Sequence, residues 1–170
     1  PTGVLRIDVT TAAEMAEAVD ANLNGCDIFI GVAAVADYRP AQARAQKIKK
    51  DGDSGLSLSL VQNPDIIASV ARRKPPLFVV GFAAETAASV SAARTKLARK
   101  GLDMIVLNDV SDKRIGFNSD DNAVTLITRE RDEQLSIGSK ASISYALIER
   151  IAAAFHTSRT RRNTAPDAAD

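Results

Sequence analysis

The stretch DIFIGVAAVA, residues 27–36, decides the fold of this 170-residue chain. It is apolar at almost every position, as expected of a strand that is covered on both faces of a parallel sheet. The same texture returns at residues 77–83 and 104–107, and helical patterns lie between these runs. The alternation predicts an α/β fold, a Rossmann-like, three-layer, doubly wound and mostly parallel sheet. Such sheets bind ligands beyond the carboxyl ends of their strands.

Two helices have clear sequence boundaries. Residues 11–14, Thr-Ala-Ala-Glu, have the spacing of a capping box and predict a helix over residues 12–23. A later helix should begin near Val90 and end at Gly101, because glycine suits the left-handed conformation that commonly follows a helix.

The segment Asn63-Pro64-Asp65-Ile66-Ile67 predicts the start of another helix, with Asn63 as N-cap and Pro64 in the first turn. The structural interpretation needs no ligand. Asp65 would repel a phosphate, so any nucleotide here should present its base or ribose.

Residues 38–62 depart from the strand–helix alternation. Residues 56–60, LSLSL, alternate with period two and predict a strand with one solvated face. Residues 38–55 before them have no clear periodicity, and a loop of that length usually serves function or assembly. We expect this excursion to be a flap or a dimerisation arm.

The C-terminal part predicts a hairpin followed by a helix. Residues 124–128 and 134–137 read as strands around a charged turn. A helix that carries Ile143, Leu147, Ile151 and Phe155 should follow. We expect one domain over residues 1–156 and a disordered tail over residues 157–170.

Composition excludes several classes. The 22 basic and 21 acidic residues leave a net charge of +1, which argues against a nucleic-acid partner. No apolar run approaches the ~20 residues that cross a bilayer, and the start lacks a signal peptide, so we expect a cytoplasmic protein without a membrane partner. The single cysteine, Cys26, and the single histidine, His156, cannot form a disulfide or a multi-histidine metal site; we expect Cys26 in the core and His156 at the surface.

Two basic clusters stand out in this nearly neutral chain. Residues 39–50 carry five basic and no acidic residues, which suits either an anion or a solvated loop. Lys96 and Lys100 lie one turn apart on the helix that ends at Gly101, where they could straddle a polyphosphate or compensate the helix dipole.

Small or polar residues follow three of the expected strands. They are residues 33–37, residues 81–86 with Phe82 as an apolar face for a ring, and Asn108 with Asp109. Each could be packing alone. Their occurrence at successive strand ends favours a ligand site.

Seven motifs resemble one known family. They are GVAAVADYRP, KIKK, NPDI, GFAAET, KLARKGLD, IVLNDV and GFNSDDNAV. In this order and spacing they resemble the phosphopantothenoylcysteine synthetase domain of the bacterial bifunctional coenzyme A biosynthesis protein. The resemblance implies a ligase that activates 4′-phosphopantothenate with CTP as an acyl-cytidylate, from which cysteine displaces CMP. It also implies a divalent cation, Mg²⁺ or Mn²⁺, and a homodimer.

The resemblance also assigns residues by position. Lys47 matches a mobile lysine that closes over the reacting phosphate, and it is the expected catalytic residue. Lys96 and Lys100 match lysines that hold the triphosphate, and Asp37 matches an aspartate near the nucleotide. The expected nucleotide pocket is completed by Gly31, Ala33, Ala34, Pro64, Asp65, Ile66, Ile67 and Phe82. The metal ligands are not assigned.

The resemblance has one departure. Family members begin with a further β–α unit that holds phosphopantothenate, and nothing in this sequence corresponds to it. From this we expect nucleotide binding with little turnover by the 170 residues alone. FMN is expected only on a fused decarboxylase domain, which could also support a higher assembly.

Two other functions remain as alternatives. A non-catalytic nucleotide-binding or dimerisation module would use the same basic residues. An NAD(P)-dependent oxidoreductase would suit the fold, but the nine glycines form neither G-x-G-x-x-G nor a Walker loop.

Overall fold

The structure is a computed structural model that describes residues 2–44, 46–49, 55–85, 89–109 and 121–164. It comprises two compact units. One contains residues 1–24 and 34–66, and the other contains residues 25–33 and 67–170. Each unit is described by itself.

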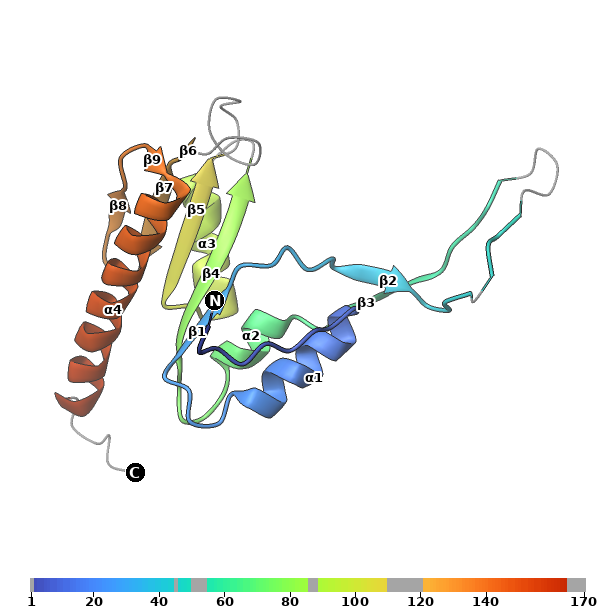
Figure 1. The fold of residues 1–170 in the computed structure, drawn as a ribbon, viewed down its shortest axis with the longest axis horizontal. Helices are drawn as coiled ribbons and strands as arrows, with labels where there is room; N and C mark the ends of the chain where they lie inside the picture. The colour runs from blue at the N-terminus through green and yellow to red at the C-terminus, as the bar shows by residue number, and fades with distance from the viewer. Residues whose placement is uncertain (1, 45, 50–54, 86–88, 110–120, 165–170) are drawn as a thin grey trace. The chain divides into compact units, whose positions relative to one another are not determined.

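The larger unit is built on a five-stranded sheet (Figure 1). The strands, in spatial order, are β1 (Ile28–Gly31), β4 (Phe78–Glu85), β5 (Met104–Asp109), β7 (Val124–Thr128) and β8 (Asp132–Gln134). β1, β4 and β5 are parallel, whereas β7 and β8 are antiparallel to their neighbours. This confirms the predicted Rossmann-like α/β class and the C-terminal hairpin.

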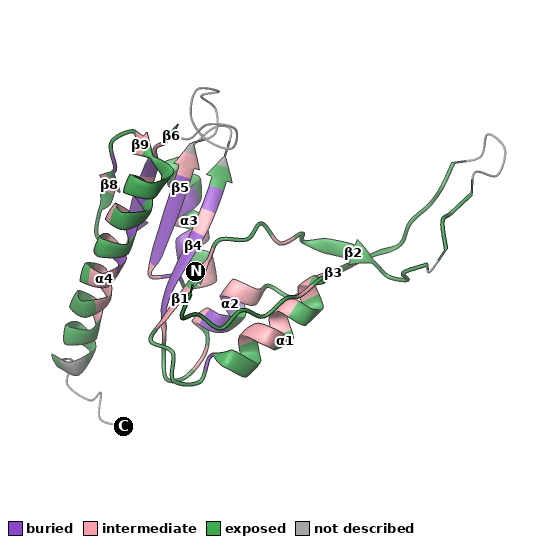
Figure 2. Ribbon diagram, in the orientation of Figure 1, coloured by how far each residue is buried: buried purple, intermediate pink, exposed green. Residues whose placement is uncertain are grey.

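Helices cover both faces of this sheet. Helix α4 (Lys140–Thr164) packs on the face that carries Phe78, Val80 and Val106, and helix α3 (Val90–Lys100) lies against β5 and β7 on the opposite face (Figure 1). Because alternate residues of a strand face opposite sides, β4 and β5 are apolar at successive positions. Figure 2 shows the buried residues concentrated in these two strands.

Helix boundaries follow the predicted caps. Helix α1 (Ala12–Asn22) starts after Thr11, whose Oγ1 accepts the N–H of Glu14 at 3.1 Å, while Glu14 Oε2 accepts the N–H of Thr11 at 3.1 Å. The backbone N–H groups of Thr10 and Thr11 donate to the Glu14 carboxylate and lower the pKa of Glu14. Helix α3 ends at Gly101, whose φ of +70° is left-handed. Both predicted ends are confirmed.

Gly101→Ala should destabilise the protein by about 1 kcal/mol, because alanine pays a steric penalty at positive φ that glycine does not. Urea unfolding measures the change. Gly55→Ala is the matched control, since Gly55 has no positive φ and a methyl group there would meet nothing within 4 Å. Equal effects of the two substitutions would contradict the prediction.

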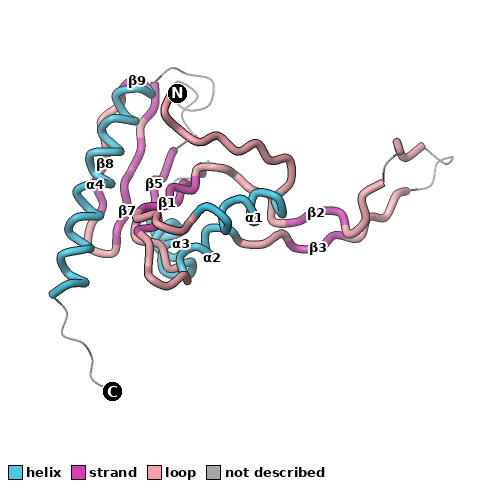
Figure 3. Tube along the Cα trace, turned by 60° about the horizontal axis from the view of Figure 1, so that its bottom comes forward, coloured by secondary structure: helices cyan, strands magenta, loops and turns pink. Residues whose placement is uncertain are grey.

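The smaller unit contains a two-stranded ribbon of β2 (Tyr38–Pro40) and β3 (Leu60–Gln62), which lie side by side and antiparallel (Figure 3). The predicted strand at residues 56–60 is wrong for residues 56–59, because only Leu60 onward pairs with β2. β2 lies at the start of residues 38–55, for which no strand was predicted. Residues 45 and 50–54 lie outside the described residues.

Two strand boundaries and the burial of one residue in the larger unit differ from prediction. β1 ends at Gly31, although the apolar run continues to residue 36. β8 begins at Asp132, inside the predicted turn. Cys26 is exposed rather than part of the core, because it precedes the first paired residue of the sheet, Ile28.

Helix α4 extends beyond its predicted end at His156, which is exposed as expected. The prediction of a disordered tail is wrong for residues 157–164, because tertiary contacts hold these turns. Arg161 Nη1 forms an ion pair with Glu130 at 2.6 Å, and Arg162 Nη1 donates to the carbonyl of Pro76 at 2.8 Å. Residues 165–170 lie outside the described residues.

Three further elements complete the described chain. β6 (Asp121–Asn122) pairs antiparallel with β9 (Gly138–Ser139) at the start of α4. α2 (Ile66–Ala71) precedes β4. Among the described residues, no helix has both the length and the hydropathy to cross a bilayer.

Candidate functional site

Two glycines shape the packing where the end of β1 lies beside the middle of β4. Gly31 and Gly81 are neighbours in the parallel register, and Ile67 of α2 lies over both. A Cβ at Gly31 would lie 3.1 Å from Ile67 Cδ1, and one at Gly81 would lie 2.9 Å from the same atom. The lack of a side chain at Gly31 and Gly81 leaves room for Ile67 against the sheet. Thus Gly31 and Ile67, both expected in the nucleotide pocket, do lie together.

Helix α2 begins at Ile66, so the prediction of Asn63 as its N-cap and Pro64 in its first turn is wrong. Asn63 has another role in the smaller unit. Its Nδ2 donates to the carbonyl of Ala36 at 2.9 Å, and its Oδ1 accepts from Arg39 Nη1 at 3.1 Å. Because these hydrogen bonds hold the Asn63 side chain at the base of the ribbon, it does not cap α2. Pro64 and Asp65 are exposed residues just before the helix.

The basic residues of the arm have different environments. Arg39 also donates to the carbonyl of Gln62 at 2.8 Å and therefore supports the ribbon. Lys47 and Lys49 are exposed beyond the ribbon, and Lys50 lies outside the described residues. Asp37 is exposed, and its carbonyl accepts the N–H of Asn63 at 2.8 Å.

Phe82 and the lysines of α3 belong to opposite faces of the sheet. Phe82 is half-buried and packs against the core beneath α4, whereas Lys96 and Lys100 are half-buried on α3. Because α3 joins two parallel strands, it starts near the carboxyl end of β4 and ends near the amino end of β5. Lys100, its last residue, therefore lies near the amino end of β5, and Gly31 is in register, through Gly81, with Ile105 near that same end.

The other expected pocket residues are Ala33 and Ala34, which are exposed just after β1. The boundary between the units falls between them, and Lys47 is in the smaller unit while Lys96 is in the larger one. The convergence of these lysines on one ligand therefore stays a prediction.

Asn108 lies near the carboxyl end of β5. The sequence placed it at a strand end but assigned it no contact with a ligand. Its Oδ1 is fully buried and has no hydrogen-bond partner in the described part of the chain. The available signal was a single amide at the end of the run MIVL, residues 104–107. The side chain of its neighbour Asp109 is not described.

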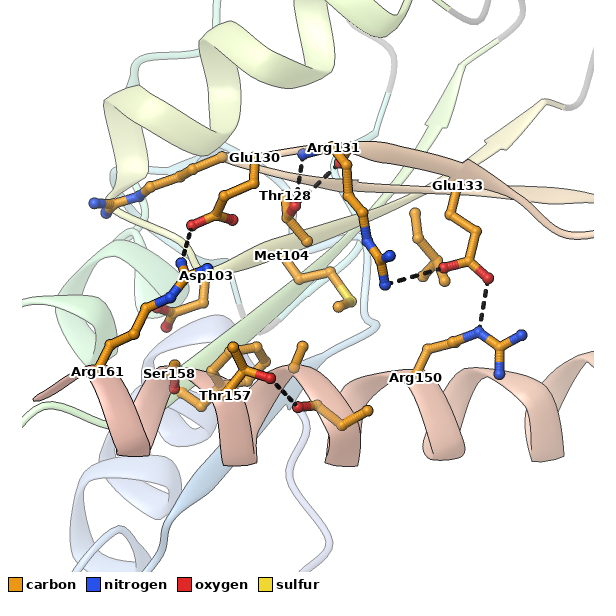
Figure 4. Close-up of a pocket in the computed structure, with 15 residues that line it drawn as sticks. Asp103, Met104, Thr128, Glu130, Arg131, Glu133, Arg150, Thr157, Ser158 and Arg161 are labelled. Carbon is orange, nitrogen blue, oxygen red and sulfur yellow. Dashed lines mark hydrogen bonds and ion pairs between the residues drawn. The ribbon is translucent and has the colours of Figure 1, made fainter. Parts of the chain in front are cut away.

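A cavity of about 480 Å³ lies between α4 and the β7–β8 hairpin (Figure 4). Phe78, Met104 and Leu126 provide its apolar wall. Its charged residues are largely paired, with Arg150 Nε 2.7 Å from Glu133 Oε1 and Arg161 bonded to Glu130, which lowers the pKa of Glu130. None of the predicted site residues lines this cavity, which lies at the amino end of β5.

Asp103 in this cavity is a half-buried carboxylate. Its Oδ2 accepts the N–H of Val79 at 2.8 Å, but burial outweighs this hydrogen bond and raises the pKa of Asp103. A carboxyl whose pKa is raised in the folded state binds its proton more tightly there than in the unfolded chain. Protonation of Asp103 therefore favours the folded state at low pH. This contribution to the free energy of unfolding is lost as pH rises through the pKa of Asp103 in the folded state.

Asp103→Asn should consequently stabilise the protein at pH 7, because the amide oxygen can still accept the Val79 N–H without burying a charge. The difference from the native protein should shrink as pH falls through the Asp103 pKa. Urea unfolding at pH 7 and pH 4 measures it. A pH-independent difference would contradict the assigned cause.

The described residues do not form a metal cage. No group of three or more histidine, cysteine, aspartate or glutamate residues occurs among them. Mg²⁺ commonly binds one or two carboxylates together with substrate phosphates. The described carboxylates do not indicate which of them would bind the ion. We therefore assign no step to a metal ion.

Comparison with known proteins adds the decisive observation. The model of one protein family, described as the DNA/pantothenate metabolism flavoprotein C-terminal domain, matches residues 1–155. The chain belongs to this family. Within the matched residues, Gly31 ends β1, Phe82 lies in the middle of β4, and Asn108 lies near the carboxyl end of β5. Residues 116–120 of the motif GFNSDDNAV lie outside the described residues.

Relatives of this flavoprotein C-terminal domain include the coenzyme A biosynthesis bifunctional proteins CoaBC. The chain is 48% identical over 155 residues to that of Vibrio parahaemolyticus, which is 89% of this chain and 38% of the relative. For the Escherichia coli K12 protein the identity is 47% over 154 residues, again 89% and 38%. The chain thus spans well under half the length of these relatives.

Solved structures agree with the fold. A crystal structure of the C-terminal domain of a CoaBC protein has a TM-score of 0.73 and 28% sequence identity, covering 92% of this chain and 71% of that one. The flavoprotein from Streptococcus pneumoniae has a TM-score of 0.68 at 20% identity, covering 86% and 72%.

Proposed function

We propose that this domain is a phosphopantothenate–cysteine ligase of coenzyme A biosynthesis. In the proposed reaction, CTP activates the carboxylate of 4′-phosphopantothenate as an acyl-cytidylate and releases pyrophosphate. The amine of L-cysteine then attacks the acyl carbon and CMP leaves, giving 4′-phosphopantothenoylcysteine. The observation that carries the proposal is the 48% identity to a CoaBC protein across 155 residues.

The geometry of the larger unit supports a flat ligand just beyond the carboxyl end of β1. Ile67 covers Gly31 and Gly81, but Ala33, beyond the end of β1, is small and exposed. Exposed backbone of this kind suits recognition of a nucleotide base. We assign the cytidine to this edge, with Asp37, Pro64, Asp65, Ile66 and Phe82 as further proposed contacts.

Cations serve the proposed activation step. When the carboxylate attacks the α-phosphate, the transition state carries more negative charge on its phosphate oxygens than bound CTP can delocalise alone. Lys47 is the proposed catalytic residue that meets this charge, because fixed cations stabilise such charge without reorganising. Lys96 and Lys100 are the proposed triphosphate contacts. A divalent cation would accompany the triphosphate.

We propose a homodimer in which the excursion at residues 38–62 forms the arm. The arm carries Leu56, Leu58 and Leu60, which are 60%, 58% and 54% exposed in one chain. Burying three leucines would favour association.

Light scattering measures the proposed dimerisation directly. The native chain should have the mass of a dimer, and Leu56→Ser with Leu58→Ser should shift it towards the monomer. Tyr145→Ser, at another exposed apolar position on α4, is the control. A monomeric native chain would contradict the dimer but not the ligase.

Product formation tests the ligase. Turnover by the 170 residues is expected to be slow, but pyrophosphate should be released only when CTP and 4′-phosphopantothenate are both present, and mass spectrometry should detect the cysteine amide after L-cysteine is added. Calorimetry with CTP, ATP and NAD should show a preference for CTP. Tight NAD binding without pyrophosphate release would overturn the proposal in favour of an oxidoreductase.

A further inference from the structure

The amide of Asn108 has an unmet need for a hydrogen-bond donor. Among the described side chains, its Oδ1 is the only buried nitrogen or oxygen atom that lacks a partner. Native proteins seldom leave such atoms unpaired, and those that occur are often at functional sites. The residue as a whole is only half-buried, so part of it reaches the surface.

The register of the sheet places Asn108 on the same face as Phe82. Phe82 is paired in register with Val106, and Ala84 with Asn108. Val106 faces the core beneath α4, so Asn108, two residues further along β5, faces the same way. Its neighbour Ala84 is small and exposed, which leaves room beside the amide. Asn108 therefore belongs to the carboxyl edge at which parallel sheets bind ligands.

The chemistry of an asparagine limits what it can hold. Its oxygen is a neutral acceptor, and rotation about χ2 readily exchanges the positions of Oδ1 and Nδ2. The phosphates of the proposed reaction are acceptors and have lysines assigned to them. The attacking amine of cysteine is a donor, and it must be uncharged to react. A neutral acceptor can orient a neutral amine without favouring its ammonium form, as a carboxylate would.

We propose that Asn108 positions the amine of the amino-acid substrate for attack on the acyl-cytidylate; this inference rests on the proposed function. The amine nitrogen uses its lone pair to form the C–N bond to the acyl carbon. The bond between that carbon and the phosphate oxygen breaks, and its electron pair leaves with CMP. The nitrogen loses a proton to water. Asn108 accepts one N–H of the amine and takes no part in proton transfer.

Separating the two half-reactions tests this role. In Asn108→Ala, pyrophosphate release from CTP and 4′-phosphopantothenate should stay within about twofold of the native rate. The kcat/KM for cysteine should fall about tenfold, which is the usual effect of losing one uncharged hydrogen bond. The fall should appear in cysteine KM and in single-turnover amide formation, with CTP KM unchanged.

Asn108→Asp provides a second, isosteric variant. Its carboxylate should favour the ammonium form of cysteine, so amide formation should be slow at neutral pH and recover as pH rises. Asn22→Asp on α1 introduces the same charge where the native Nδ2 donates to the Ala18 carbonyl, and it should leave the pH profile unchanged.

Several outcomes would overturn the assignment. They are a cysteine kcat/KM within threefold of native in Asn108→Ala, a loss confined to CTP KM, and equal losses in both half-reactions with a lower unfolding midpoint. Failure of both variants to fold would make Asn108 a structural residue. If the native protein releases no CTP-dependent pyrophosphate, the proposed function itself fails, which is a distinguishable result.

Discussion

Lys47→Ala should reduce the rate of acyl-cytidylate formation about a hundredfold while changing CTP affinity little. Removing one fixed group that stabilises transition-state charge commonly costs about 3 kcal/mol of barrier. Lys47 is exposed beyond the ribbon, away from the hydrogen bonds that hold β2 to β3, so its removal should leave the fold intact. Pre-steady-state pyrophosphate release measures the rate, and calorimetry measures the affinity.

Lys49→Ala is the matched control, because it removes the same charge two residues away from an equally exposed position. It should retain nearly the native rate. The result also separates the ligase from a non-catalytic nucleotide-binding module. In such a module Lys47→Ala would weaken CTP binding, and there would be no rate to lose. Equal losses in the two variants would show a general electrostatic effect of the arm.

Ile105→Ala should destabilise the larger unit by about 4 kcal/mol, near the upper end of the range for a buried aliphatic side chain. Ile105 has no exposed surface and lies on the central strand β5, paired in register with Gly81 on one side and Ile127 on the other. Its neighbours are fixed by the sheet and cannot close the cavity. The free energy of unfolding in urea measures the loss.

Ile148→Ala is the control for hydrophobicity, since Ile148 on α4 is 58% exposed. Its substitution should change the free energy of unfolding by no more than about 0.5 kcal/mol. A comparable loss at both positions would mean that Ile148 is covered in solution. A small loss at Ile105 would contradict the packing of β5 described above.

Local signals predicted the helices and the central strands well. The caps at Thr11 and Gly101 act within a few residues, so their sequence patterns determine the ends of α1 and α3. The buried strands β4 and β5 were recognisable because both faces are covered and residues 77–83 and 104–107 lack polar side chains.

The errors arise where distant contacts decide. Asn63 has the pattern of an N-cap, but its partners Ala36 and Arg39 are remote in sequence. The polar sequence of the last turns of α4 predicted disorder. They are helical, and Arg161 forms an ion pair with Glu130 in the turn of the β7–β8 hairpin. Position along the strands could be predicted for Phe82 and Asn108, whereas the unpaired oxygen of Asn108 required coordinates.

The topology of β5 also determines how the molecule opens. This strand has a partner on each edge and a helix over each face, so its backbone amides have no local route to water. Their deuterium uptake should therefore require global unfolding, while the edge strand β8 should exchange through smaller openings. The proposed ligand edge would then lie at the end of the most slowly exchanging strand. Bound substrates would contact a strand that does not open locally on the timescale of turnover.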